Sequence, residues 1–248
     1  MKKIIGIGWD VGGWMGRKNG IAVAQWIVGS DQIQWLGSTV CSIASGKAFT
    51  PHNLFRLAVK NSDTELLEES HVVISIDAPL GYPDDFVKFV TDKQVLFKKP
   101  AKVIDNRLAY RDTERHIYQT FGRIPLSATF DKLGNNASVA IYHIRIWCRD
   151  LGYSVHPKMK SIQDTKTIIE VYPALIKDKR GNVLSPVKEL LPDYVKEGTD
   201  EGDAAICAVM AIAYGANGRY SKLPKLIGPS KEWITAAKSE GWIYHFPK

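Results

Sequence analysis

The chain has 248 residues, a length that suits one large domain or two small ones and that buries enough surface to fold without disulfides. Hydrophobic residues make up 45% of the sequence and charged residues 24%, which excludes a disordered or fibrous protein. The net charge is +7, and it is uneven, because residues 1–87 hold 7 Lys and Arg against 9 Asp and Glu whereas the rest holds 26 against 17. A basic surface attracts nucleic acids and nucleotides, although many enzymes with other substrates are also basic.

The sequence shows no sign of secretion or of a membrane span. Its three cysteines, Cys41, Cys148 and Cys207, lie far apart and are odd in number, so no disulfide framework is indicated. No apolar run reaches the length of about 18 residues that a membrane helix needs, and Trp9-Asp10 interrupts the N-terminal apolar run before a signal peptide could form. We therefore expect a cytoplasmic protein without membrane association.

The first elements predict an antiparallel meander. Apolar, β-branched runs cover residues 3–9, 21–28 and 33–40, and short turns rich in glycine separate them. Connections this short join antiparallel neighbours. The first run ends at Asp10.

A crossover then returns the chain to the first strand. Residues 51–69 show a helical pattern, with an expected break near 61–63, and residues 72–77 form a second buried strand that ends at Asp77. A strand reached through a helical crossover pairs in parallel with an earlier one, so the sequence predicts that Asp10 and Asp77 meet at one edge of the sheet.

Residues 83–165 are richer in helix signals, and we predict that they form a helical cap inserted into one domain that spans residues 1–248. Within this segment the pattern predicts helices at 105–122 and 137–151. Arg107, Arg111 and Arg115 recur every four residues and would share one helix face.

Two further acidic positions follow. Glu170 lies in a short apolar strand near residues 167–172, and Asp200 and Asp203 open a helix expected over residues 200–215. Burying an ionised carboxylate is costly unless it is paired or bound to a metal ion, so several acids on apolar elements suggest a site. The alternative for any one of them is a structural role, for example a helix cap at Asp200 or a turn at Asp77.

Five short segments and their order resemble a known family. The segments are Gly8-Trp9-Asp10, Ile76-Asp77-Ala78-Pro79-Leu80-Gly81, Tyr110-Arg111-Asp112-Thr113-Glu114-Arg115, Ile169-Glu170-Val171-Tyr172-Pro173 and Asp200-x-x-Asp203-Ala204. They resemble the domain-of-unknown-function family 429, which is described as predicted nucleases of the ribonuclease H-like superfamily. The resemblance implies an α/β fold with a ribonuclease H-like mixed sheet, an antiparallel meander plus parallel strands, flanking helices and a helical insertion.

The acids suit divalent-metal chemistry on a phosphodiester. Two divalent ions can activate a water molecule and stabilise the leaving oxygen, and Mg²⁺ or Mn²⁺ prefers carboxylate ligands. We expect Asp10 to bridge the ions, Asp77 and Asp203 to flank them, and Glu170 or Asp200 to serve as a fourth ligand or to orient the water. The predicted catalytic residues are thus Asp10, Asp77, Glu170 and Asp203, and the predicted metal ligands are Asp10, Asp77, Asp200 and Asp203.

The arginines could bind the substrate. A guanidinium group suits phosphate oxygens, so Arg111 and Arg115 are candidate substrate-binding residues, ahead of Arg107. In the alternative, neighbouring acids such as Asp112 and Glu114 pair with them on a solvated helix face.

Three functions remain open from the sequence. The first is a nuclease or phosphodiesterase that acts on a nucleic acid or nucleotide with Mg²⁺ or Mn²⁺. The second is a non-catalytic module that binds nucleic acid or nucleotide, for which salt-sensitive binding without turnover is expected. The third is an actin-like or sugar-kinase-type phosphotransferase, suggested by the loop Asp10-Val11-Gly12-Gly13, although such proteins normally duplicate this fold.

Overall fold

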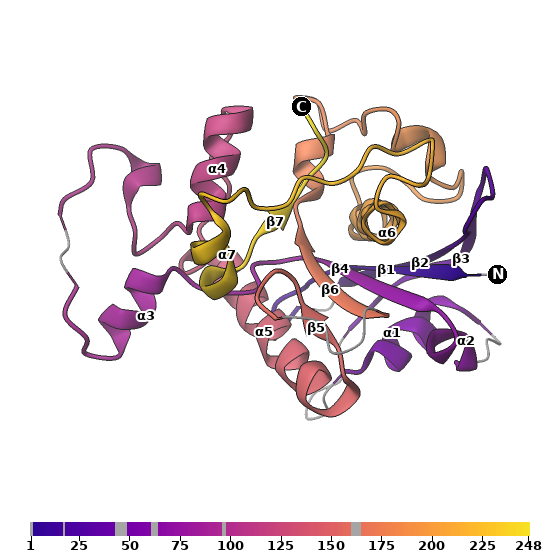
Figure 1. The fold of residues 1–248 in the computed structure, drawn as a ribbon, viewed down its shortest axis with the longest axis horizontal. Helices are drawn as coiled ribbons and strands as arrows, with labels where there is room; N and C mark the ends of the chain where they lie inside the picture. The colour runs from indigo at the N-terminus through magenta and orange to yellow at the C-terminus, as the bar shows by residue number, and fades with distance from the viewer. Residues whose placement is uncertain (1, 17, 43–48, 61–63, 96–97, 160–164) are drawn as a thin grey trace.

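The computed structural model describes residues 2–16, 18–42, 49–60, 64–95, 98–159 and 165–248. Within them the chain is an α/β protein built on a mixed sheet with the strand order β3-β2-β1-β4-β6-β5, and β7 also pairs with β6 (Figure 1). The strands are β1 (Lys3–Asp10), β2 (Asn19–Ile27), β3 (Ile33–Cys41), β4 (His71–Asp77), β5 (Ser154–Val155), β6 (Lys166–Val171) and β7 (Ile243–Tyr244). The pairs β1/β2 and β2/β3 are antiparallel, whereas β4, β5, β6 and β7 join the sheet through parallel pairings.

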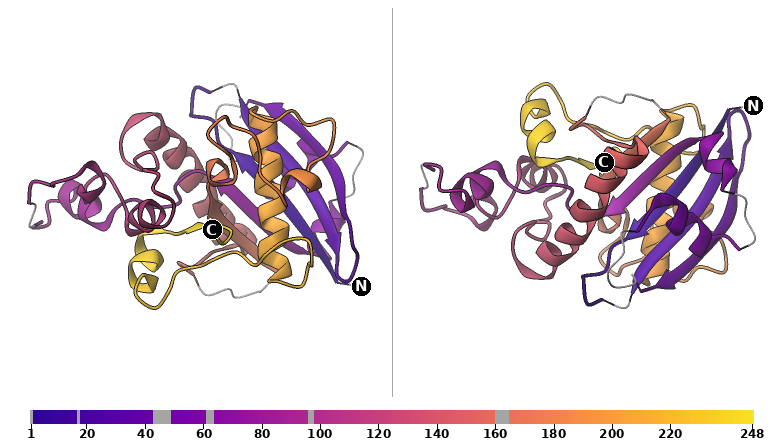
Figure 2. Two further views of the ribbon diagram at one scale, coloured as in Figure 1. Left: turned by 90° about the horizontal axis from the view of Figure 1, so that it is seen from above. Right: turned by 90° about the horizontal axis from the view of Figure 1, so that it is seen from below.

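Helices cover both faces of this sheet. The α-helices are α1 (Pro51–Ala58), α2 (Glu65–Glu68), α3 (Asp84–Val90), α4 (Asp112–Phe121), α5 (Asp131–Leu151), α6 (Asp200–Ala216) and α7 (Ile234–Glu240). Short 3-10 turns lie at Val103–Asp105, Pro173–Ile176 and Lys188–Leu190. Figure 2 shows α6 crossing one face of the sheet, with α5 on the other side. No helix in the described ranges combines the length and the apolar character that a membrane span requires.

Side chains of β1 alternate between the two faces and so divide the core. Ile5, Ile7 and Trp9 are fully buried in one apolar cluster with residues of α1 and α5. Ile4 belongs to the other cluster, which α6 dominates. Because successive residues of a strand face opposite sides, Asp10 projects toward the α6 side.

Most predicted elements are confirmed. The three strands of the meander, the parallel strand that ends at Asp77 and the helix from Asp200 all form close to the predicted bounds. The crossover is split into α1 and α2, and the predicted break at 61–63 lies outside the described residues.

The predictions for residues 83–165 were less accurate. The first helix begins at Asp112 and not at residue 105, so Arg107 and the N-cap residue Arg111 both precede it, and the three arginines share no helix face. The second helix begins six residues earlier than predicted, at Asp131, and its buried side packs on the sheet. Because β5 also pairs with β6, this segment is in part integral to the sheet, and it is the region around α3 that projects from the body (Figure 1).

Candidate functional site

Two carboxylates stand side by side at the carboxyl edge of the central strands. In the parallel pairing of β1 with β4, Asp10 is the register partner of Asp77. Neighbouring strands lie about 4.8 Å apart, and paired residues of parallel strands point to the same face. Both side chains therefore share the α6 side of the sheet, as the sequence predicted when it placed the two strand ends at one edge.

Glycines in β1 allow α6 to pack directly on the strand backbone. A Cβ atom on Gly8 would lie 1.9 Å from the carbonyl oxygen of Ala204, and one on Gly6 would lie 2.5 Å from that of Ala208. The Ser75 hydroxyl on β4 also donates a hydrogen bond to the Cys207 carbonyl oxygen of α6. These contacts fix the first turn of α6 above the carboxyl ends of β1 and β4.

The first turn of α6 adds two more acids. Thr199 caps the helix by accepting a hydrogen bond from the Gly202 backbone N–H at 3.1 Å. Asp200 and Asp203 follow on this turn, and the negative charges of both act on Asp10. The structure therefore brings four of the five predicted acids into one electrostatic cluster, defined here as Asp10, Asp77, Asp200 and Asp203.

The cluster holds its central carboxylates in an unusual electrostatic state. Burial, together with the charges of Asp203 and Asp200, raises the pKa of Asp10 from 3.8 to about 7. Burial and the charges of Asp10 and Asp203 raise the pKa of Asp77 well above its usual value. Like charges this close cannot all ionise freely, so the cluster either keeps protons near neutral pH or needs a cation.

Lys177 supplies one cation from within the chain. Its Nζ forms an ion pair with the Asp203 carboxylate, and its charge lowers the pKa of both Asp10 and Asp77. Sequence reasoning missed this residue because it lies in the stretch Lys177-Asp178-Lys179-Arg180, where nothing distinguishes one basic side chain from the next.

Glu170, the fifth predicted acid, has a different environment. It is almost completely buried and pairs with Arg111, whose Nη1 donates to Glu170 Oε2 at 2.8 Å. The same oxygen accepts a hydrogen bond from the Leu80 backbone N–H at 2.9 Å. Glu170 thus holds the loop that follows Asp77, and its charge contributes to raising the pKa of Asp77. The geometry gives it a positioning role, and the predicted role as a fourth ligand or a water-orienting residue stays a prediction.

Arg111 is not placed to bind a substrate. Its side chain is fully buried between the carboxylates of Glu114 and Glu170 and also donates to the Glu240 carbonyl oxygen at 3.1 Å. Burial opposes the positive charge of Arg111, but the two carboxylates outweigh this effect and raise its pKa. The predicted substrate contact therefore disagrees with the structure, because no part of this guanidinium reaches the surface.

Arg115 and Arg107 are paired with acids nearer the surface. Arg115 forms an ion pair with Asp112 and donates to the Tyr110 carbonyl oxygen at 2.7 Å. Arg107 Nε lies 2.7 Å from Asp85 Oδ2. The alternative from the sequence, that neighbouring acids neutralise these arginines, matches this geometry for Arg115.

A small cavity opens beside the paired carboxylates. It has a volume of about 150 Å³ and is lined by Asp10 and Asp77, by the buried carboxylate of Glu170, and by side chains that include Asn136 and Tyr172. A water molecule takes up about 30 Å³ in the liquid, so this space suits a few waters or a hydrated ion, and a larger group would need more room.

The donor set suits a hard divalent cation, but the arrangement is incomplete. Carboxylate oxygens are the ligands that Mg²⁺ and Mn²⁺ prefer, and the carboxylates of Asp10 and Asp77 line the cavity together with that of Glu170, which is paired with Arg111. Among the described residues, however, no three His, Cys, Asp or Glu side chains stand close enough to hold a metal ion together. Since Asp203 is paired with Lys177, a site of three carboxylates requires Asp203 to exchange that partner for the ion.

The loop after Asp10 is closed to a phosphate group. The backbone N–H of Gly12 donates to Asn19 Oδ1 at 2.9 Å, and a Cβ atom on Gly13 would lie 2.2 Å from Asn135 Nδ2. A phosphate loop needs free backbone N–H groups, so the loop geometry speaks against the phosphotransferase alternative. A comparison of the chain with protein-family models, with curated proteins and with solved structures found no match.

Proposed function

We propose that this protein hydrolyses phosphodiester bonds, with Mg²⁺ or Mn²⁺ held at the carboxylates of Asp10 and Asp77. The observation that carries the proposal is the register pairing of these two acids at the carboxyl edge of β1 and β4. Their raised pKa values reflect negative charge that Lys177 neutralises only in part. Such a cluster lowers the stability of the folded chain, and functional sites commonly have this effect.

The proposed roles follow from position. Asp10 and Asp77 would hold the ion, and Asp203 would complete the ligand set from the first turn of α6, where Asp200 adds negative charge. A bound divalent ion would supply Lewis acidity and an activated water molecule. Asp203 would release Lys177 when the ion binds, and Glu170 would keep the loop after Asp77 in place.

The resemblance to ribonuclease H-like nucleases supports the choice of substrate class. The resemblance rests on segments that include Asp10, Asp77 and Asp203, and these are the acids that form the cluster. The excess of basic residues after position 87 suits a nucleic acid or a nucleotide.

The test is turnover of labelled single-stranded, duplex, hybrid and branched nucleic acids with Mg²⁺, with Mn²⁺ and with EDTA. We expect metal-dependent cleavage that falls at least about 100-fold in Asp10→Asn and in Asp77→Asn, since each removes a ligand charge. The matched control is Asp193→Asn, an exposed acid outside the cluster, which should cleave like the wild type. Cleavage that survives in both cluster variants would contradict the proposal.

One observation favours a second candidate, a binding module without turnover. The Lys177–Asp203 ion pair already neutralises part of the cluster, as a purely structural arrangement would. This candidate predicts salt-sensitive binding of nucleic acid or nucleotide, with no cleavage of any substrate by the wild type and no effect of Mg²⁺ on thermal stability.

A further inference from the structure

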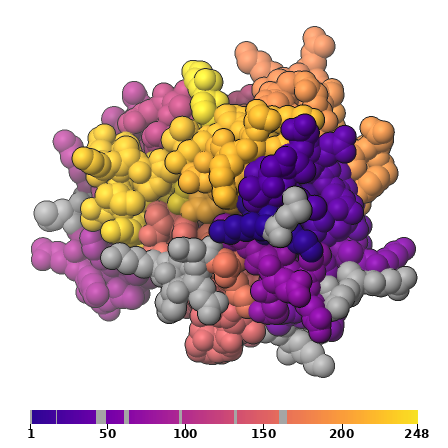
Figure 3. Space-filling view, turned by 45° about the vertical axis from the view of Figure 1, so that its right-hand side comes forward, coloured from indigo at the N-terminus to yellow at the C-terminus, as the bar shows by residue number. Residues whose placement is uncertain are grey.

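A second cavity lies at the opposite edge of the sheet from the acids. Its volume is about 510 Å³, and its wall includes Lys2, which precedes β1, His71 at the start of β4 and Thr167 of β6. The space-filling view shows the N-terminal segment in indigo and the C-terminal segment in yellow meeting on one face (Figure 3). Eight residues at about 3.3 Å each separate Lys2 from Asp10, so the wall of the cavity at Lys2 lies about 26 Å from Asp10 along the strand direction.

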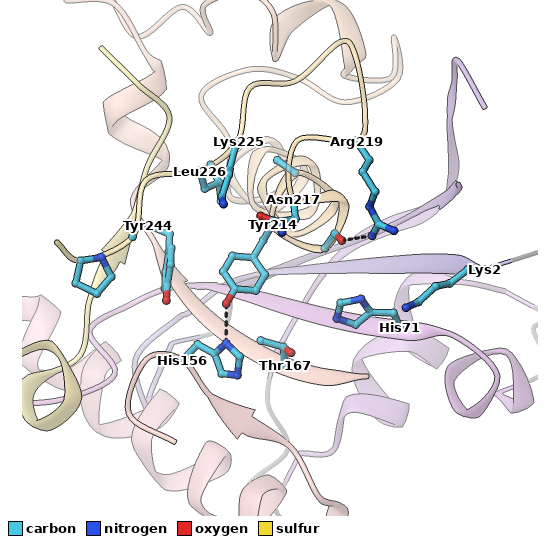
Figure 4. Close-up of a pocket in the computed structure, with 14 residues that line it drawn as sticks. Lys2, His71, His156, Thr167, Tyr214, Asn217, Arg219, Lys225, Leu226 and Tyr244 are labelled. Atoms are coloured by element: carbon cyan, nitrogen blue, oxygen red, sulfur yellow. Dashed lines mark hydrogen bonds between the residues drawn. The ribbon is translucent and has the colours of Figure 1, made fainter. Parts of the chain in front are cut away.

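Among the residues that the structure describes, the charged ones that line this cavity are all basic. Lys2, Arg219 and Lys225 contribute three cations, the imidazoles of His71 and His156 join them, and none of the described lining residues is Asp or Glu. Figure 4 shows Lys2, His71 and Arg219 reaching toward the same space. A concave surface lined by one sign of charge focuses the field and concentrates ions of the opposite sign.

Arg219 is held in place for such a ligand. Its Nε donates to the Ala216 carbonyl oxygen at 2.9 Å, and its Nη2 donates to that of Gly215 at 3.1 Å. These bonds anchor the guanidinium at the carboxyl end of α6, where its charge also offsets the helix dipole. A guanidinium has five N–H donors. In the described chain the N–H groups of Arg219 that do not contact Ala216 or Gly215 make no hydrogen bond, so they can donate to an anion.

The opposite wall is aromatic. The Tyr214 hydroxyl and His156 Nδ1 share a hydrogen bond of 2.6 Å, and the rings of Tyr214 and Tyr244 meet edge to face with centroids 5.0 Å apart (Figure 4). Burial raises the pKa of the Tyr214 hydroxyl, so it stays protonated. Aromatic rings offer an apolar surface to the organic part of a ligand.

We propose that this cavity binds a small organic phosphate, with the phosphate group at Arg219 and Lys2 and the organic part against Tyr214 and Tyr244, while Lys225 adds positive charge to the wall. The volume lies within the range of small-molecule sites. A bare phosphate ion has five heavy atoms and fills only a small part of it, which favours an ester over the inorganic ion.

The test is calorimetric titration of the whole chain with AMP, with inorganic phosphate and with adenosine, in EDTA and low salt. EDTA keeps divalent ions from the acid cluster, so the titration reports on the basic cavity alone. We expect AMP to bind at least about tenfold more tightly than inorganic phosphate, and adenosine not to bind. Failure of every phosphate to bind at about 10 mM would overturn the proposal, and equal affinity for AMP and phosphate would overturn the assignment of an ester.

Variants locate the binding. Arg219→Gln and Lys2→Gln should each weaken AMP binding about threefold to tenfold, the effect of losing one partly exposed charge pair. Lys222→Gln removes the same charge from the loop that holds Arg219 but lies outside the cavity, and it should bind like the wild type. If Arg219→Gln disturbs the end of α6, Lys2→Gln still decides, because the exposed Lys2 side chain supports no helix. Equal weakening by Lys222→Gln would overturn the proposal, since the effect would then be one of overall charge.

This inference does not rest on the proposed phosphodiesterase function. Asp10→Asn should leave AMP binding in EDTA unchanged, because the acid cluster lies at the other edge of the sheet. Loss of cleavage together with intact AMP binding would confirm both sites as separate. Loss of AMP binding in Asp10→Asn would place the ligand at the acids and overturn the inference.

Discussion

Replacing Asp10 with asparagine should stabilise the metal-free protein at neutral and alkaline pH. The folded chain raises the pKa of Asp10 from 3.8 to about 7, so between these values the folded state holds a proton that the unfolded state has lost. Asp10 therefore stabilises the folded wild type at low pH, and this stabilisation is lost as the pH rises from about 4 to about 7. Asparagine keeps the shape of the side chain without the charge.

The size of the effect follows from the shift. One pKa unit corresponds to 1.36 kcal/mol, so a rise from 3.8 to about 7 sets an upper bound of roughly 4 kcal/mol on the cost of ionised Asp10. Asp10 is only partly buried, and solvent screening reduces this to about 2 kcal/mol. For a chain of this size the melting temperature should rise by about 4–8 °C above pH 7.

The assay is thermal unfolding in EDTA from pH 4 to pH 8, with Asp193→Asn as the exposed control. The gain in melting temperature for Asp10→Asn should be near zero at pH 4 and should reach its full value above pH 7, whereas the control should show no such trend. Added Mg²⁺ should reverse the order, because it can stabilise only the protein that retains the ligand. A gain independent of pH, or a loss of stability at pH 8, would refute the electrostatic reasoning.

Three further predictions concern the residues around the cluster. Arg111→Met leaves two buried carboxylates without their partner and should cost about 3–5 kcal/mol in urea unfolding; a loss below about 1 kcal/mol would contradict the buried ion-pair assignment. Gly8→Ala places a methyl group against the backbone of α6 and should cost roughly 3 kcal/mol or more in the same assay; wild-type stability would show that the helix can move away. Lys177→Met removes the charge that lowers the pKa of Asp10, so carbon NMR of the labelled aspartate carboxyl should show titration above pH 7; an unchanged midpoint would argue against the coupling.

The sequence predicted the parts of the site that local pattern controls. Apolar runs that end in an acid gave β1 with Asp10 and β4 with Asp77, and the helical crossover between them gave their parallel pairing. The sequence did not indicate how closely α6 packs on the glycines of β1, or that this packing sets the position of Asp203 relative to Asp10. The packing depends on two elements that are far apart in the chain.

The differences between prediction and structure concern charged side chains whose partners are distant in sequence. Arg111 and Glu170 were each predicted to serve the substrate or the water, yet they neutralise each other across 59 positions of the chain. Likewise, a spacing of four residues predicted a common face for three arginines, but the helix starts only at Asp112. A single sequence carries no signal for which charge meets which, because tertiary contacts decide it.

The contact between β1 and α6 also limits how the acid cluster can adapt to a ligand. Sliding α6 along its axis would drive its carbonyl oxygens into the strand at Gly6 and Gly8, and would break the hydrogen bond from Ser75. The backbone beneath the acids therefore behaves as a rigid frame. Any change that admits a cation must come from rotation about side-chain bonds, above all as Asp203 turns away from Lys177. Such rotations take nanoseconds, far faster than the movement of a lid or a domain, so capture of the ion would be limited by the loss of its own water shell.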